Sequence, residues 1–99
     1  MDLKENERID NLQLKDLKII QNKNGFCFGI DSVLLADFAK TIKAGAKVID
    51  LGTGSGVIAT LLCGKTKLKS ILGVEIQEKV CNMANRSILL NQLEDRFQI

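Results

Sequence analysis

The residues of this chain that could do chemistry are three alternating glycines and the carboxylates on either side of them. Gly52, Gly54 and Gly56 follow a short apolar run, and a second apolar run begins directly after them. A strand that turns sharply into a helix favours residues without a Cβ atom, because the backbone adopts unusual φ values and a ligand can lie directly against it. The unpaired N–H groups at the start of the helix face the same crevice. This spacing predicts a site for a nucleotide-like cofactor, with a purely structural tight turn as the alternative.

A carboxylate after the next apolar run strengthens this interpretation. Glu75 ends the stretch Ser70 to Glu75 and lies 19 residues beyond Gly56. At the carboxyl edge of a neighbouring strand, such a side chain reaches the crevice of a wound sheet and can accept hydrogen bonds from both hydroxyls of an adenosine ribose. Considered alone, Glu75 has the alternative of a solvated strand end or an acid at a helix N-terminus.

Two features distinguish among the possible cofactors: the spacing of the glycines and the acid that precedes them. Dinucleotide-binding turns have the pattern G-x-G-x-x-G, whereas Val57 stands here where the third glycine would be. Asp50 precedes the turn and would bring a negative charge near a diphosphate, but it suits the ammonium group of a methionine-type ligand. The lysine of nucleoside triphosphate-binding loops does not follow this turn. Charge and spacing therefore favour S-adenosylmethionine.

Alternating strands and helices are expected to position these residues. In chain order we expect a strand at Lys47 to Leu51, a helix at Val57 to Cys63, a strand at Ser70 to Glu75, a helix at Gln77 to Asn91 and the start of a strand at Arg96 to Ile99. We expect Gly64 to close the first of these helices in a left-handed cap. This order predicts a parallel sheet with right-handed crossovers.

The residues before this unit predict a leader, a hairpin and one helix. Residues 1–13 are mainly polar and predict a loosely ordered leader, residues 14–46 the hairpin and helix, and residues 47–99 a partial cofactor-binding domain. We expect Leu17 to Gln21 and Phe26 to Phe28 to pair across a turn at residues 22–25. The helix is expected to start with Asp31 or Ser32 as N-cap and to end near residues 43–45. Its apolar positions form a broad face, at Val33, Leu34, Ala36, Phe38 and Ala39.

Composition limits the class of protein and its partners. The 99 residues are 45% hydrophobic and carry a net charge of only +2, so one small domain is expected and no uniform field holds a nucleic acid by itself. Three cysteines without paired spacing and no histidine predict a reduced, cytoplasmic protein without a zinc site. No apolar run is long enough for a membrane span, and the first residues do not form a signal peptide.

The chain resembles the class I S-adenosylmethionine-dependent methyltransferases, whose signature is an acid followed by G-x-G-x-G, here Asp50 to Gly56. Residues 25–36, GFCFGIDSVLLA, are similar to the bacterial tRNA (adenine-N6) methyltransferases that modify a valine tRNA, in which a hairpin and a G-x-D-x-x-L-L-type helix precede the glycine turn. The resemblance covers residues 14–99. It implies an α/β fold: the N-terminal half of a doubly wound Rossmann-like sheet, preceded by a β-hairpin and a helix.

The resemblance also implies a role for each matched residue. The implied cofactor-binding residues are Phe28, Gly29, Asp31, Asp50, Gly52, Thr53, Gly54, Ser55, Gly56, Glu75 and Ile76. Glu75 would bind the ribose, Ile76 would lie beside the adenine, and the others would surround the methionine end. Phe28 has the alternative of a core aromatic, and Asp31 that of an N-cap.

The chain departs from the family in one informative way. Enzymes that methylate an exocyclic adenine nitrogen carry an Asn/Asp-Pro-Pro-Tyr/Phe segment, and this chain has no proline and no tyrosine. We therefore expect the complete protein to methylate adenine N6 in tRNA, and these 99 residues to hold a cofactor half-site without turnover. A truncated sheet with open edges would also self-associate. The alternatives are a non-catalytic cofactor-binding or assembly module and, less favoured, a nicotinamide-dependent oxidoreductase. Within the methyltransferases, a protein or small-molecule acceptor is a further alternative.

Overall fold

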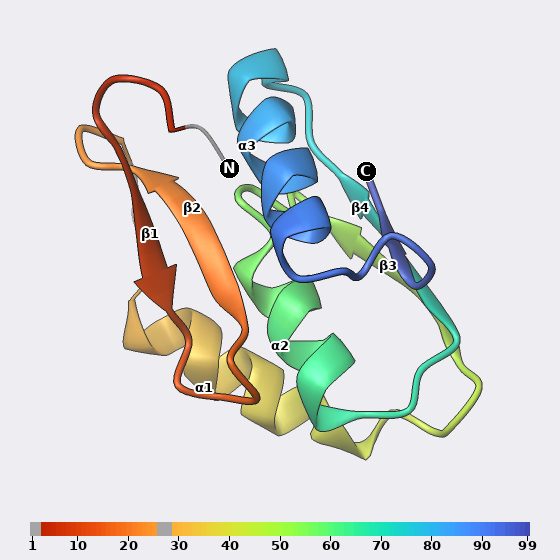
Figure 1. Cartoon of the computed structure of the whole chain (residues 1–99). Helices are drawn as coiled ribbons and strands as arrows, with labels where there is room; N and C mark the ends of the chain where they lie inside the picture. The colour runs from red at the N-terminus through yellow and green to blue at the C-terminus, as the bar shows by residue number, and fades with distance from the viewer. Residues whose placement is uncertain (1–2, 26–28) are drawn as a thin grey trace.

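The computed structural model describes residues 3–25 and 29–99, which form five strands, three α-helices and a short 3-10 helix (Figure 1). In chain order these are β1 (Glu7–Asn11), β2 (Lys18–Asn22), α1 (Ile30–Phe38), the 3-10 helix η1 (Ala39–Thr41), β3 (Lys47–Leu51), α2 (Val57–Lys65), β4 (Ser70–Val74), α3 (Glu78–Leu90) and β5 (Phe97–Gln98).

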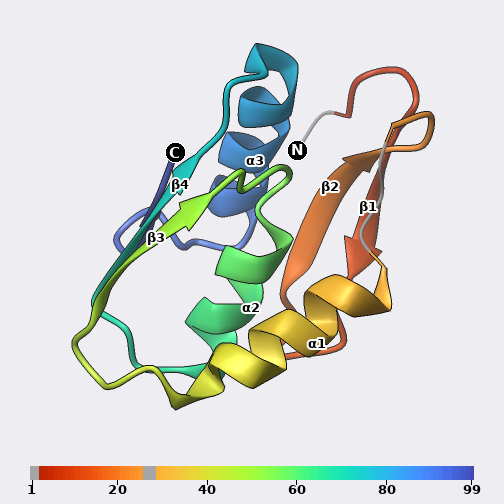
Figure 2. The same cartoon turned by 180° about the vertical axis from the view of Figure 1, so that it is seen from behind.

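The strands form two separate sheets with a helix layer between them. Strands β3, β4 and β5 lie side by side in that order and are parallel, which confirms the wound sheet predicted from the sequence. Strands β1 and β2 form an antiparallel hairpin. Helices α2 and α3 lie between the parallel sheet and the hairpin, and α1 lies beside α2 (Figures 1 and 2). The glycine turn and Glu75, the residues that could do chemistry, therefore have the sheet on one side and the hairpin on the other.

Apolar side chains from every layer meet around α2. The sheet contributes Ile71 and Phe97, the hairpin contributes Ile19, and α2 contributes Leu61 and Leu62 to one buried cluster. Each of these side chains is almost fully removed from solvent. Such burial is the main favourable term that holds the layers together.

The first strand lies where the sequence predicted a loosely ordered leader, so that prediction is wrong for residues 7–11. Strand β1 pairs with β2 in a register that places Ile9 opposite Ile20. The predicted strand at Leu17 to Gln21 agrees with β2, but its partner precedes it in the chain. The predicted return strand at residues 26–28 lies outside the described residues.

Several helix ends also differ from the prediction. Gly64 lies inside α2 rather than capping it, and a Cβ atom there would be 2.7 Å from Leu17 Cδ1, so close packing explains the glycine. Helix α1 starts two or three residues earlier than predicted, with Gly29 as N-cap and without a capping side chain. Asp31 therefore lies in the first helical turn and is not the N-cap. The regular helix ends at Phe38, before the predicted end.

The predicted apolar face of α1 is largely uncovered. Only Ala36 of this helix is buried, whereas Leu34 and Phe38 are 60% and 84% exposed. The sheet also has one bare apolar face, formed by Ile49, Leu51, Leu72 and Val74. None of the helices in residues 3–25 and 29–99 has the length and apolar character needed to cross a membrane.

Candidate functional site

The glycine turn joins β3 to α2 and is built from left-handed residues. Gly52, Gly54 and Gly56 have φ angles of 66°, 60° and 87°, and Gly56 is the N-cap of α2. A side chain at such φ values clashes with the following carbonyl, so glycine is the residue that fits this path. The amide of Thr53 donates to the Val74 carbonyl at 3.0 Å, which ties the turn to the end of β4.

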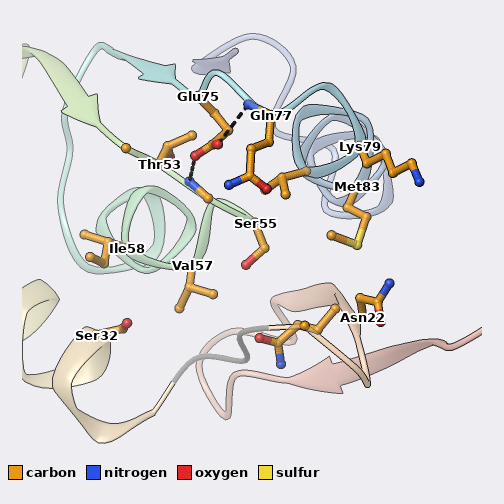
Figure 3. Close-up of a pocket in the computed structure, with 15 residues that line it drawn as sticks. Asn22, Ser32, Thr53, Ser55, Val57, Ile58, Glu75, Gln77, Lys79 and Met83 are labelled. Carbon is orange, nitrogen blue, oxygen red and sulfur yellow. Dashed lines mark hydrogen bonds between the residues drawn. The ribbon is translucent and has the colours of Figure 1, made fainter.

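Glu75 lies directly against this turn. The Gly54 amide donates to its Oε1 at 3.1 Å, and the Gln77 amide donates to its Oε2 at 3.1 Å (Figure 3). One carboxylate therefore joins the glycine turn, the end of β4 and the residue before α3. The structure brings together the two features that the sequence placed 19 residues apart.

Asp50 is held from the turn that follows it. The Thr53 hydroxyl donates to Asp50 Oδ2 at 2.7 Å. Thr53 is buried, with 7% of its surface exposed, whereas Asp50 is half-buried, so the hydrogen bond lies partly inside the protein. The bond fixes one carboxylate oxygen at the base of the turn.

A cavity of about 460 Å³ opens beside the turn, between α2, α3 and the hairpin (Figure 3). Its volume lies within the range of small-molecule sites in proteins. The residues that line it are Gln21, Asn22, Gly25, Ser32, Gly52, Thr53, Gly54, Ser55, Val57, Ile58, Glu75, Gln77, Lys79, Val80 and Met83. Five of the residues singled out in the sequence are among them, at positions 52–55 and 75.

The other predicted residues lie outside this lining. Asp50 and Gly56 lie at the two ends of the turn and Ile76 is 94% exposed, and none of the three lines the cavity. Gly29 and Asp31 are exposed, and Ser32 from the same helix faces the cavity instead. Phe28 lies outside the described residues.

The sequence prediction missed two walls of the cavity. One is the hairpin, which contributes Gln21 and Asn22, and the other is the first part of α3. On α3, Lys79, Val80 and Met83 share a side at helical spacing, which is a signal in the sequence. No cluster of potential metal ligands occurs in residues 3–25 and 29–99.

A buried ion pair holds the hairpin wall against α3. Both terminal nitrogens of Arg86 donate to the Glu7 carboxylate, at 2.6 and 2.5 Å. The Arg86 hydrogen bonds hold the pKa of Glu7 below its ordinary value of 4.5, and they raise the pKa of Arg86. The Ile20 amide also donates to Ser87 Oγ at 2.9 Å in the buried interface. The cavity wall is therefore fixed by polar contacts as well as by packing.

Comparison with known proteins identifies relatives for most of the chain. A family model described as ribosomal protein L11 methyltransferase (PrmA) matches residues 30–99. The tRNA1(Val) (adenine(37)-N6)-methyltransferase of Flavobacterium johnsoniae is 30% identical over 85 residues, covering 86% of this chain and 36% of that protein. The ribosomal protein L11 methyltransferase of Carboxydothermus hydrogenoformans is 33% identical over 92 residues, covering 86% of this chain and 29% of that protein. The chain thus spans about a third of the length of these curated relatives.

Solved structures share the fold, which confirms the predicted partial Rossmann-like architecture. P. horikoshii TYW2 in complex with MeSAdo has a TM-score of 0.79 at 16% identity, covering 96% of this chain and 35% of that one. M. jannaschii TYW2 in complex with AdoMet has a TM-score of 0.78 at 18% identity, covering 100% of this chain and 45% of that one. Because the family model covers more than half of the chain, the protein belongs to the ribosomal protein L11 methyltransferase (PrmA) family, among the class I S-adenosylmethionine-dependent methyltransferases that its sequence resembles.

Proposed function

We propose that the cavity beside the glycine turn binds S-adenosylmethionine. The observation that carries the proposal is the Glu75 carboxylate, which bridges the turn and the start of α3 at the edge of the cavity. A carboxylate has about four lone-pair sites, so two acceptor sites are left for the two ribose hydroxyls after Gly54 and Gln77 have donated. The backbone amides fix the carboxylate before the cofactor arrives.

With the ribose at Glu75, the other predicted residues would contact the rest of the cofactor. Asp50 and the backbone of residues 52–56 would bind the ammonium and carboxylate ends of the methionine portion. Ile76 would cover the adenine, and its 94% exposure would fall when the cofactor binds. Phe28, Gly29 and Asp31 would close the methionine end.

We further propose that the complete protein transfers the methyl group to adenine N6 of a tRNA. In that reaction the amino nitrogen attacks the methyl carbon, the carbon–sulfur bond breaks, its electron pair stays on sulfur, and the nitrogen releases a proton. The similarity to tRNA1(Val) (adenine(37)-N6)-methyltransferases favours this acceptor. The match of residues 30–99 to the L11 methyltransferase model favours ribosomal protein L11 as a second candidate.

These 99 residues lack the Pro-Pro-Tyr type of segment, so the proposal includes cofactor binding without methyl transfer by this chain alone. The bare sheet face and open strand edges also support a role as an assembly module that another polypeptide segment completes. A cytoplasmic location fits the free thiols of Cys63 and Cys81.

Calorimetric titration of the chain with S-adenosylhomocysteine, and separately with NAD, tests the cofactor assignment. We expect saturable binding of S-adenosylhomocysteine and weaker binding of NAD; the reverse order would support the oxidoreductase alternative and contradict the proposal. Incubation of the chain with labelled S-adenosylmethionine and either tRNA or protein L11 tests the proposed lack of turnover. Methyl transfer to either acceptor by the 99-residue chain would contradict the predicted lack of turnover.

A further inference from the structure

We infer that Gly73 is a positioning residue for the cofactor site, because its missing side chain leaves the space in which Thr53 orients Asp50. The inference rests on the proposed cofactor site. Gly73 lies in β4, and its register partner in β3 is Asp50. The two residues and Thr53 therefore meet on the helix-facing side of the sheet, directly below the glycine turn.

The space above Gly73 is filled by Thr53. A Cβ atom added at Gly73 would be 2.7 Å from Thr53 Cγ2, 2.9 Å from Thr53 Oγ1 and 3.0 Å from Ile99 Cδ1. Gly73 is not among the glycines with positive φ, so the backbone conformation does not explain the residue. The close approach of the Thr53 side chain to the Gly73 backbone explains the glycine instead, and such close approaches are common at glycines within strands.

Thr53 has little freedom to move away from an added methyl group. Its side chain is β-branched and therefore stiff at χ1, and it is buried. Its amide also donates to the Val74 carbonyl at 3.0 Å, so the backbone is fixed to the same strand. Any displacement of Thr53 would consequently change the turn itself.

Displacement of Thr53 would affect both ends of the cofactor cavity. The hydroxyl that donates to Asp50 at 2.7 Å would lose its geometry at the methionine end. The next residue, Gly54, donates its amide to Glu75 at 3.1 Å, so the ribose end would move as well. One absent side chain in β4 thus determines the placement of both carboxylates.

The test compares S-adenosylhomocysteine binding by the wild-type chain and by variants at two positions. Gly73→Ala introduces the clash, and Thr53→Val keeps the shape of the side chain but removes the hydroxyl. We expect each to weaken binding about tenfold or more, since each removes a hydrogen bond to a charged group. Thr53→Ser keeps the hydroxyl, so it should bind within about threefold of wild type, and the Gly73→Ala/Thr53→Ser double variant should regain part of the loss.

Gly64→Ala is the matched control, because it places a Cβ atom 2.7 Å from Leu17 Cδ1, outside the cavity. Its affinity should equal that of wild type, whatever its melting temperature. A wild-type chain that does not bind S-adenosylhomocysteine would contradict the proposed function. Wild-type binding together with unchanged affinity in Thr53→Val would overturn the positioning role alone. Unchanged affinity in Gly73→Ala would overturn it as well. If Gly73→Ala does not fold, the Gly73→Ala/Thr53→Ser double variant replaces it, and an affinity equal to that of Thr53→Ser would overturn the positioning role.

Discussion

At the scale of single residues, Glu75 connects three segments that come from different parts of the chain. Its two oxygens accept from the amides of Gly54 and Gln77, one in the glycine turn and one before α3. Hydrogen bonds to an ionised group are stronger than those between neutral groups. The carboxylate therefore organises the edge of the cavity before it contacts any ligand.

Replacement of this carboxylate by an amide should weaken cofactor binding with little loss of fold. In Glu75→Gln one oxygen remains as an acceptor, while the new NH₂ group faces an amide that needs an acceptor. We expect the affinity for S-adenosylhomocysteine to fall about ten- to a hundredfold, measured by titration calorimetry.

Glu78→Gln is the control for this prediction, because Glu78 is an exposed acid in the first turn of α3 that does not line the cavity. It should bind as wild type does. Equal affinity in Glu75→Gln and Glu78→Gln would contradict the ribose-binding role of Glu75.

The sequence predicted the residues near the turn because their positions follow from local spacing. Glycines between a strand and a helix, and an acid at the end of the next strand, meet whenever the two strands are parallel neighbours. Asn22 and Met83 could not be found in this way, since their approach to the turn depends on how the hairpin packs on α3. Local spacing therefore brings residues 52–55 and 75 to one cavity, whereas two walls of this cavity come from packing that local spacing does not reveal.

At the scale of elements, the hairpin is a cavity wall that a largely buried ion pair helps to hold against α3. Glu7 in β1 is 9% exposed and pairs with Arg86 on α3, and β2 contributes Gln21 and Asn22 to the cavity. Strand β1 has only Ile9 as an apolar residue, so its sequence resembles a polar leader. Its backbone pairs with β2, and Glu7 is anchored by Arg86, 79 residues away, a contact that no local pattern reveals.

Breaking this ion pair should destabilise the fold and change its response to acid. Removal of one member of a buried pair costs about 3 kcal/mol, so Glu7→Gln should lower the melting temperature clearly. Arg8→Gln, on the more exposed Arg8–Asp10 pair of the same strand, should have a smaller effect.

The pH dependence follows from the lowered pKa of Glu7. Because the Arg86 hydrogen bonds lower this pKa in the folded state, the pair contributes its full stability above the ordinary value of 4.5. The contribution is lost as the pH falls through the lowered folded-state pKa. Thermal melts from about pH 3 to about pH 7 should show the gap between wild type and Glu7→Gln narrowing toward acid. A gap that stays constant with pH would contradict the ionic origin of the effect.

At the scale of the whole molecule, the layers leave apolar surface in contact with water. One face of the parallel sheet packs on α2 and α3, whereas the opposite face presents Ile49 and Leu51 at 64% and 79% exposure. Strand β3 pairs only with β4 in the described sheet, so its other edge offers unpaired backbone groups. Apolar surface next to an open strand edge favours association with another chain.

We therefore predict that the 99-residue chain self-associates in a concentration-dependent way, as sedimentation velocity should show. The double variant Ile49→Lys/Leu51→Lys should shift the population toward monomer, because charges on the exposed face and beside the open edge oppose pairing. Its melting temperature at low concentration should change little, since both side chains are already exposed. Leu89→Lys, at a 58% exposed position on α3, is the control and should leave the association unchanged. A wild-type chain that stays monomeric at about 1 mM would contradict the prediction, because association through an apolar face and a strand edge should be detectable at that concentration.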